Sequence, residues 1–151
     1  MAGTNVALAK RALIDIIRAS GSADLTGVQV EYSWPGASAE RECVHLGRAT
    51  WDTEQLAMRG GGRMPRKEQL NVDLFVIVVL PGGTVQEAED RATQIGGAIE
   101  DIIAADTTLS QPSSTGLLLA GISGGEIDHD TTDDEAIAAI QYRVAFLSKL
   151  T

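Results

Sequence analysis

Cys43 and His45 are the residues of this sequence best suited to nucleophilic or acid–base chemistry. They stand two positions apart in a segment with the pattern of a strand, so their side chains share one face. A cysteine beside a histidine can act as an activated nucleophile. At such a position, however, a cysteine is more often a small buried hydrophobic residue. The pair supports, as one alternative, a small ligand-binding or enzymatic domain.

Two glycine-containing segments resemble catalytic or phosphate-binding motifs. Gly121 to Gly125 matches the G-x-S-x-G pattern of serine hydrolases, but that motif needs a helix directly after the strand, and no helical pattern follows. Gly60 to Arg63 is glycine-rich but matches neither the Walker pattern nor G-x-G-x-x-G. We therefore predict no catalytic residue and no cofactor-binding residue, and we interpret residues 52–65 as a flexible loop.

An acidic segment from Glu126 to Glu135 could offer oxygen ligands to a hard cation. It departs from the calcium-binding EF-hand pattern, because Thr132 and Asp133 stand where the third acidic ligand and the glycine belong. The two histidines of the chain are also far apart in sequence. We expect no metal site, and we interpret residues 124–135 as an acidic hairpin loop in water.

The elements that would position these residues are organised around a strand, a turn and a helix between Arg66 and Glu100. Apolar residues alternate along the strand onto one face, whereas the other face begins polar and turns apolar at Phe75, Ile77 and Val79. Pro81 and two glycines end the strand. A capping box of Thr84 and Glu87 then begins a helix, whose apolar stripe is made to lie on the sheet.

The remaining segments predict one further helix and four further strands. The helix begins after Thr4 or Asn5 and ends near Ser20, and the strands occupy residues 28–33, 41–51, 117–123 and 137–150. The order is α-β-β-β-α-β-β, which predicts an α+β fold with a mostly antiparallel sheet of about five strands and two helices. At 151 residues, the chain is expected to form a single domain, 1–151.

Composition limits the classes of function that are open to the chain. The net charge of −9 argues against binding nucleic acid through phosphate contacts. A single cysteine excludes a disulfide within the chain. No run approaches the roughly 20 apolar residues of a membrane span, and Lys10 and Arg11 interrupt any secretory signal. We expect a soluble protein without a membrane partner.

Charge is distributed unevenly between two loops. Four of the 12 Lys and Arg residues lie between positions 59 and 67, and six of the 21 Asp and Glu residues lie between 126 and 135. Loops of opposite sign favour head-to-tail pairing between copies of the chain, and the apolar second face of the long strand needs cover. The predicted subunit interface comprises Arg59, Arg63, Arg66, Lys67, Asp128, Asp130, Asp133, Asp134, Phe75, Ile77 and Val79.

Three segments together resemble the tail terminator (tail completion) proteins of long-tailed bacteriophages. They are VQVEYSWPG at 28–36, AERECVHLG at 39–47 and PGGTVQEAE at 81–89. The resemblance implies a homohexameric ring at the head-tail junction of the virion, assembled in the cytoplasm of the bacterial host. Its partners would be the tail tube protein and the head-tail connector or head-closure protein. DNA would pass through an acidic bore without specific binding, and no catalysis is implied.

Two alternatives to a tail terminator remain. The first is another neck or tail-tube component, such as a head-closure protein or tube subunit, because tube subunits share the sheet-plus-helix plan. The second is the ligand-binding or enzymatic domain that would use Cys43 and His45.

Overall fold

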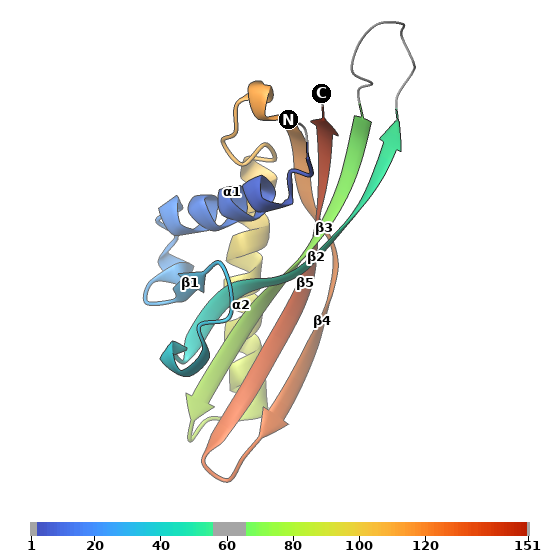
Figure 1. The fold of residues 1–151 in the computed structure, drawn as a ribbon. Helices are drawn as coiled ribbons and strands as arrows, with labels where there is room; N and C mark the ends of the chain where they lie inside the picture. The colour runs from blue at the N-terminus through green and yellow to red at the C-terminus, as the bar shows by residue number, and fades with distance from the viewer. Residues whose placement is uncertain (1–2, 56–65, 151) are drawn as a thin grey trace, which may run out of the picture.

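A five-stranded sheet forms the frame of the protein, and both helices pack into one core with it (Figure 1). The computed structural model describes residues 3–55 and 66–150, without the side chain of Leu118. The strand order is β1-β2-β3-β5-β4. The predicted α+β class, the two helices and the mostly antiparallel sheet are confirmed.

The central strand β3, Arg66–Pro81, follows the alternation of its sequence. Even-numbered side chains from Glu68 to Val78 are buried against the helices, and odd-numbered ones from Gln69 to Val79 are exposed or half-buried on the other face. It pairs antiparallel with β2, Glu42–Gln55, and with β5, Glu135–Leu150. We call the face without helices the outer face of the sheet.

Helix α2, Val85–Ala105, lies along the core face and contacts β3, β5 and β4. It begins with the predicted capping box, in which the Glu87 N–H donates to Thr84 Oγ1 at 3.1 Å and the Thr84 N–H donates to Glu87 Oε1 at 3.3 Å. Gly96 faces Tyr142, whose hydroxyl oxygen would lie 2.0 Å from a Cβ at that position. The helix therefore approaches the sheet closely because a glycine stands at the contact.

Helix α1, Val6–Ala19, lies across α2 and leads through a short 3-10 turn, η1 (Ala23–Leu25), to β1 (Figure 1). Strand β1 is only Gln29–Glu31 and pairs parallel with Cys43–His45 of β2. Arg91 of α2 fastens this part of the chain, because its guanidinium donates two hydrogen bonds to the Glu42 carboxylate and one to the Asp24 carbonyl.

Two predicted strand ends were wrong. Strand β2 extends to Gln55, so residues 52–55 of the predicted loop are strand, and residues 56–65 lie outside the described part of the chain. Strand β4, Leu117–Thr131, continues through the segment predicted as a loop and leaves only 132–134 as a turn before β5. Its glycines are accommodated because a register shift between Ile122 and Gly124 adds a residue, and because β5 approaches Gly125 closely. Two further 3-10 turns, η2 (Gly36–Ser38) and η3 (Ser113–Thr115), lie in connections.

Candidate interaction surfaces

Cys43 and His45 lie side by side along the outer face of β2, but both are buried. Their exposed fractions are 1% and 8%. Burial raises the pKa of the Cys43 thiol, and the charge of Glu31 raises it further. A thiol that stays protonated at neutral pH is a poor nucleophile. This environment favours a structural role for Cys43 over the enzymatic alternative.

His45 forms the middle of an aromatic group on the outer face. Its ring stacks on Phe75 with centroids 4.9 Å apart and planes at 15°, and Trp34 lies on it at 5.2 Å. Gly47 allows Phe75 to pack tightly, since a Cβ there would lie 2.6 Å from the Phe75 ring. The chain therefore supplies part of the cover that Phe75 was expected to need from another copy.

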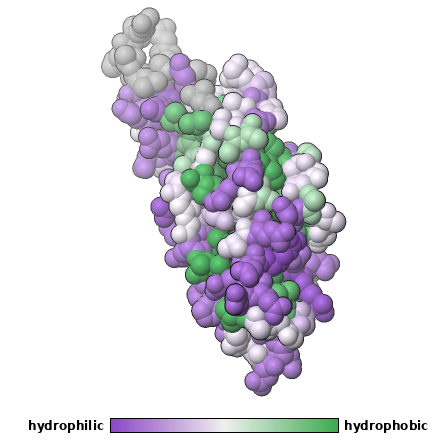
Figure 2. Space-filling view, turned by 180° about the vertical axis from the view of Figure 1, so that it is seen from behind, coloured by the Kyte–Doolittle hydropathy of each residue, from purple (hydrophilic) through white to green (hydrophobic). Residues whose placement is uncertain are grey.

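The other two apolar residues of this predicted interface, Ile77 and Val79, are half-buried on the same outer face. Their neighbours across β5 are Ala139 and Ile137, so the apolar character extends to a second strand. Figure 2 shows the molecule from behind, and its apolar side chains form separate groups among hydrophilic ones. The interface role of Phe75, Ile77 and Val79 stays a prediction.

The acidic residues predicted at the interface fall into two sets. Asp128 and Asp130 lie on β4, opposite Ala139 and Ile137 of β5, whereas Asp133 and Asp134 lie in the turn. The Asp128 Oδ1 accepts the N–H of His129 and the Asp130 Oδ1 accepts the N–H of Thr131, both at 2.8 Å. Among the described residues no group of three or more potential metal ligands is found. These two aspartates therefore accept backbone N–H groups of their own strand, which the sequence did not indicate.

The basic residues lie at the opposite end of the sheet from the acidic turn. Arg66 and Lys67 begin β3 near the C-terminus, and the 132–134 turn is at the far end of the β4–β5 hairpin (Figure 1). Arg59 and Arg63 lie outside the described residues. Because β3 and β5 are fully extended between the two ends, charges at one end cannot pair with those at the other within one chain. Pairing between copies stays a prediction.

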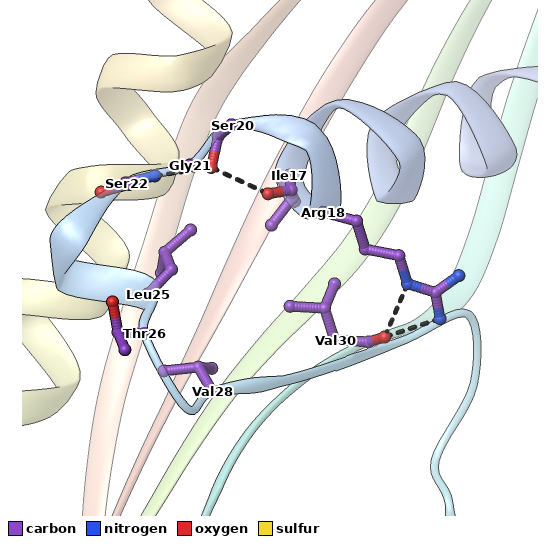
Figure 3. Close-up of a pocket in the computed structure, with 9 residues that line it drawn as sticks. All are labelled: Ile17, Arg18, Ser20, Gly21, Ser22, Leu25, Thr26, Val28 and Val30. Carbon is purple, nitrogen blue, oxygen red and sulfur yellow. Dashed lines mark hydrogen bonds between the residues drawn. The ribbon is translucent and has the colours of Figure 1, made fainter.

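A hollow of about 340 Å³ lies where α1, η1 and β1 meet (Figure 3). Arg18 closes one side by donating from Nε and Nη2 to the Val30 carbonyl at 3.0 and 2.7 Å, and Ser20 Oγ donates to the Ile17 carbonyl at 2.9 Å. Arg18 thus binds a backbone carbonyl of β1, whereas Ser20 binds a carbonyl in the last turn of its own helix. The Arg18 contact points to a structural joint between α1 and β1.

A second hollow, of about 380 Å³, lies over β3, β5 and β4 and is lined mainly by apolar groups. Leu119, Ala145 and Leu147 contribute to it, and Leu119 is 50% exposed. The hollow lies beside β4, the edge strand of the sheet. It is an apolar surface that adjoins an edge of the sheet.

The architecture defines the chain as an α+β protein in which one face of a mostly antiparallel sheet is covered by helices. One solved chain with this fold belongs to the structure described as "Virion of native gene transfer agent (GTA) particle". The two superpose with a TM-score of 0.55 at 18% identity, covering 92% of this chain and 94% of the other. At this identity the likeness establishes the fold, and it does so over nearly the whole of both chains.

The other comparisons give no match. No model of a protein family matches the sequence. No curated protein matches it either. Within the described residues, no helix is both long and apolar enough to cross a membrane.

Proposed function

We propose that this chain is a structural protein of a phage-like virion, which forms a homo-oligomeric, hexameric ring that ends the tail tube and joins it to the head connector. The observation that carries the proposal is the shared fold with a chain of a gene transfer agent virion along 92% of this sequence. The resemblance of three segments to tail terminators supports a position at the head-tail junction of the virion.

The distribution of charge supports a ring through which DNA passes without specific binding. The chain carries a net charge of −9, and exposed acidic residues lie near the turn of the β4–β5 hairpin. An acidic bore repels phosphates and lets the genome move. Basic and acidic groups at opposite ends of the sheet suit head-to-tail contacts between copies of the chain.

Electron microscopy of the purified protein, alone and with tail tubes, tests the proposal. Short isolated rings, or rings seated on tube ends, are the expected result. Long tubes would instead identify a tail-tube subunit, and a chain that stays a single subunit with tubes present would contradict the ring. Native mass in dilute and concentrated solution gives the subunit number.

The charge contribution has its own test. Reversing Arg63 and Arg66 to Glu should weaken oligomerisation, and added salt should weaken the wild-type oligomer more than the variant. Sedimentation velocity at two salt concentrations measures both effects. Equal behaviour of the two proteins would remove the charge pairing but leave a ring held by apolar strands.

The enzymatic alternative is tested at Cys43 and His45. Replacing both with Ala removes buried packing, including the ring between Trp34 and Phe75, but the variant that folds should still form rings, because neither side chain is proposed to do chemistry. A reaction that wild-type protein catalyses and this double variant does not would overturn the structural role.

A further inference from the structure

Strand β4 is an edge of the sheet, and part of its backbone edge is covered by the chain itself. Near its start, the Ala120 N–H donates to the Thr107 carbonyl at 2.7 Å. Near its end, the Asp128 and Asp130 carboxylates accept the N–H groups of His129 and Thr131. Side chains that occupy edge N–H groups in this way block the addition of another strand.

The segment between these covered ends is open. The Thr132 N–H donates across the turn to the Glu135 carbonyl, which fixes the alternation of inward and outward groups along β4. The N–H groups of Thr131 and His129 point away from β5, and so do those of Ile127 and Gly125, because the direction alternates from one residue to the next. The extra residue between Ile122 and Gly124 shifts this alternation by one position. Before it, Ala120 and Ile122 are the residues whose N–H groups point away from β5.

The open segment, Ile122–Ile127, has the composition of a pairing strand. Its sequence is ISGGEI, with one charge and no proline, and Ile127 is 43% exposed. Natural edge strands are usually protected by charges, prolines or covering segments. An edge protected on both sides of a six-residue gap is suited to receive one short strand in one place.

The opposite edge of the sheet offers a strand that runs antiparallel to β4. Strand β1 covers only Cys43–His45 of β2, so within the described chain Ala49–Gln55 has a strand on one side alone. Trp51 on this segment is 50% exposed. Each neighbouring pair from β2 through β3 and β5 to β4 is antiparallel, so β2 and β4 run in opposite directions. A copy placed edge to edge with the same orientation would continue an antiparallel sheet.

We propose that Ile122–Ile127 is a strand-addition site that receives Ala49–Gln55 of a second copy. The inference deepens the proposed ring and rests on it. Such a contact joins two different surfaces of the chain, so repetition around an axis can close a ring. Asp128 and Asp130 then act as edge guards, which confine the neighbour to the open segment and fix its position along β4.

The first test removes one outward N–H. Ile127→Pro takes away a donor that β5 does not use, and proline is tolerated at such edge positions. Ile127→Val keeps the donor and is the matched control. We expect Ile127→Pro to weaken association about five-fold or more per contact, the effect of one lost backbone hydrogen bond, and Ile127→Val to resemble the wild type. Sedimentation equilibrium measures the change, and circular dichroism verifies that both variants fold.

The second test opens the guarded end. Asp128→Ala removes the acceptor and frees the His129 N–H, whereas Asp128→Asn loses the same charge but keeps an acceptor oxygen. We expect Asp128→Ala to associate more strongly or in longer, less uniform assemblies, and Asp128→Asn to do so to a smaller extent. If the two variants behave alike, charge rather than edge protection governs the effect, and the guard role is overturned.

Hydrogen exchange separates this inference from the proposed ring. On assembly, the amides of Ile122–Ile127 and of Ala49–Gln55 should gain protection, and those of His129 and Thr131 should change little. Rings that form without this protection, and that Ile127→Pro leaves unchanged, would overturn strand addition and leave the ring in place. A wild-type chain that never assembles, even on tail tubes, would overturn the ring itself.

Discussion

Glu68 places a carboxyl group in the core, where it caps the N-cap residue of helix α1. Its side chain is 0% exposed, and its Oε1 accepts the backbone N–H of Asn5 at 2.9 Å. Asn5 is the N-cap residue of α1, but its own side chain makes no capping bond and no acidic residue follows in the first turn. Instead, the Asn5 Nδ2 donates to the Thr115 carbonyl at 3.1 Å and to Ser148 Oγ at 2.7 Å.

Replacing Glu68 with Ala should lower the free energy of unfolding by about 1–3 kcal/mol. The partly buried Asn5 N–H would lose its acceptor, and a donor left without a partner costs roughly 1–3 kcal/mol. Part of the loss is offset, since the second carboxylate oxygen of Glu68 is buried without a hydrogen-bond partner among the described residues. Glu68→Gln keeps an acceptor oxygen in a side chain of similar shape, so its loss should stay below about 1 kcal/mol.

Urea unfolding followed by circular dichroism measures both variants, with Asn5→Ala as a control. That change keeps the backbone N–H that Glu68 accepts and removes only the side-chain hydrogen bonds to Thr115 and Ser148, so it separates those bonds from the contact with Glu68. Hydrogen exchange should show faster opening of the first turn of α1 in Glu68→Ala than in the wild type. Equal losses for the Ala and Gln variants, or an unchanged opening rate of the first turn of α1 in Glu68→Ala, would refute capping of α1 by Glu68.

Other changes test the packing of α2 and the state of the buried thiol. Gly96→Ala should destabilise the fold by about 1–3 kcal/mol, because its Cβ would overlap the Tyr142 hydroxyl. Gly97→Ala, with open space around its Cβ, should stabilise the fold by up to about 1 kcal/mol. Thermal unfolding compares the two variants, and equal effects would contradict the close contact. Native Cys43 should react with a thiol reagent far more slowly than the urea-unfolded chain at the same pH, since burial raises its pKa. The same shift predicts that the free energy of unfolding falls as pH rises above about 8.5, where the unfolded thiol ionises first, and that Cys43→Ala reduces this fall.

Local sequence patterns predicted the central hairpin because its determinants are close together in the chain. The alternation in β3 and the capping box of α2 each depend on residues a few positions apart, and both are present. The ends of β2 and β4 could not be found in this way. Glycines at 124 and 125 resemble a loop, and only the backbone of β5, at Arg143 and Tyr142, keeps them extended.

For the candidate interaction surfaces, too, local patterns indicated some residues but not their contacts. The sequence indicated acids near position 128 and apolar residues at 75–79, but not what these side chains contact. Glu68 carried one local signal, since it stands in phase with the buried face of β3, yet its partner lies 63 positions away.

By itself, the sequence determined the α+β class, the order of its elements and the excess of negative charge. Each of these follows from the type and spacing of neighbouring residues. Only the tertiary structure decided that Cys43 is buried, that aspartates cover one stretch of the β4 edge and that Ile122–Ile127 is left open. Those outcomes depend on which backbone groups remain unpaired after distant strands have come together, and no local pattern records that.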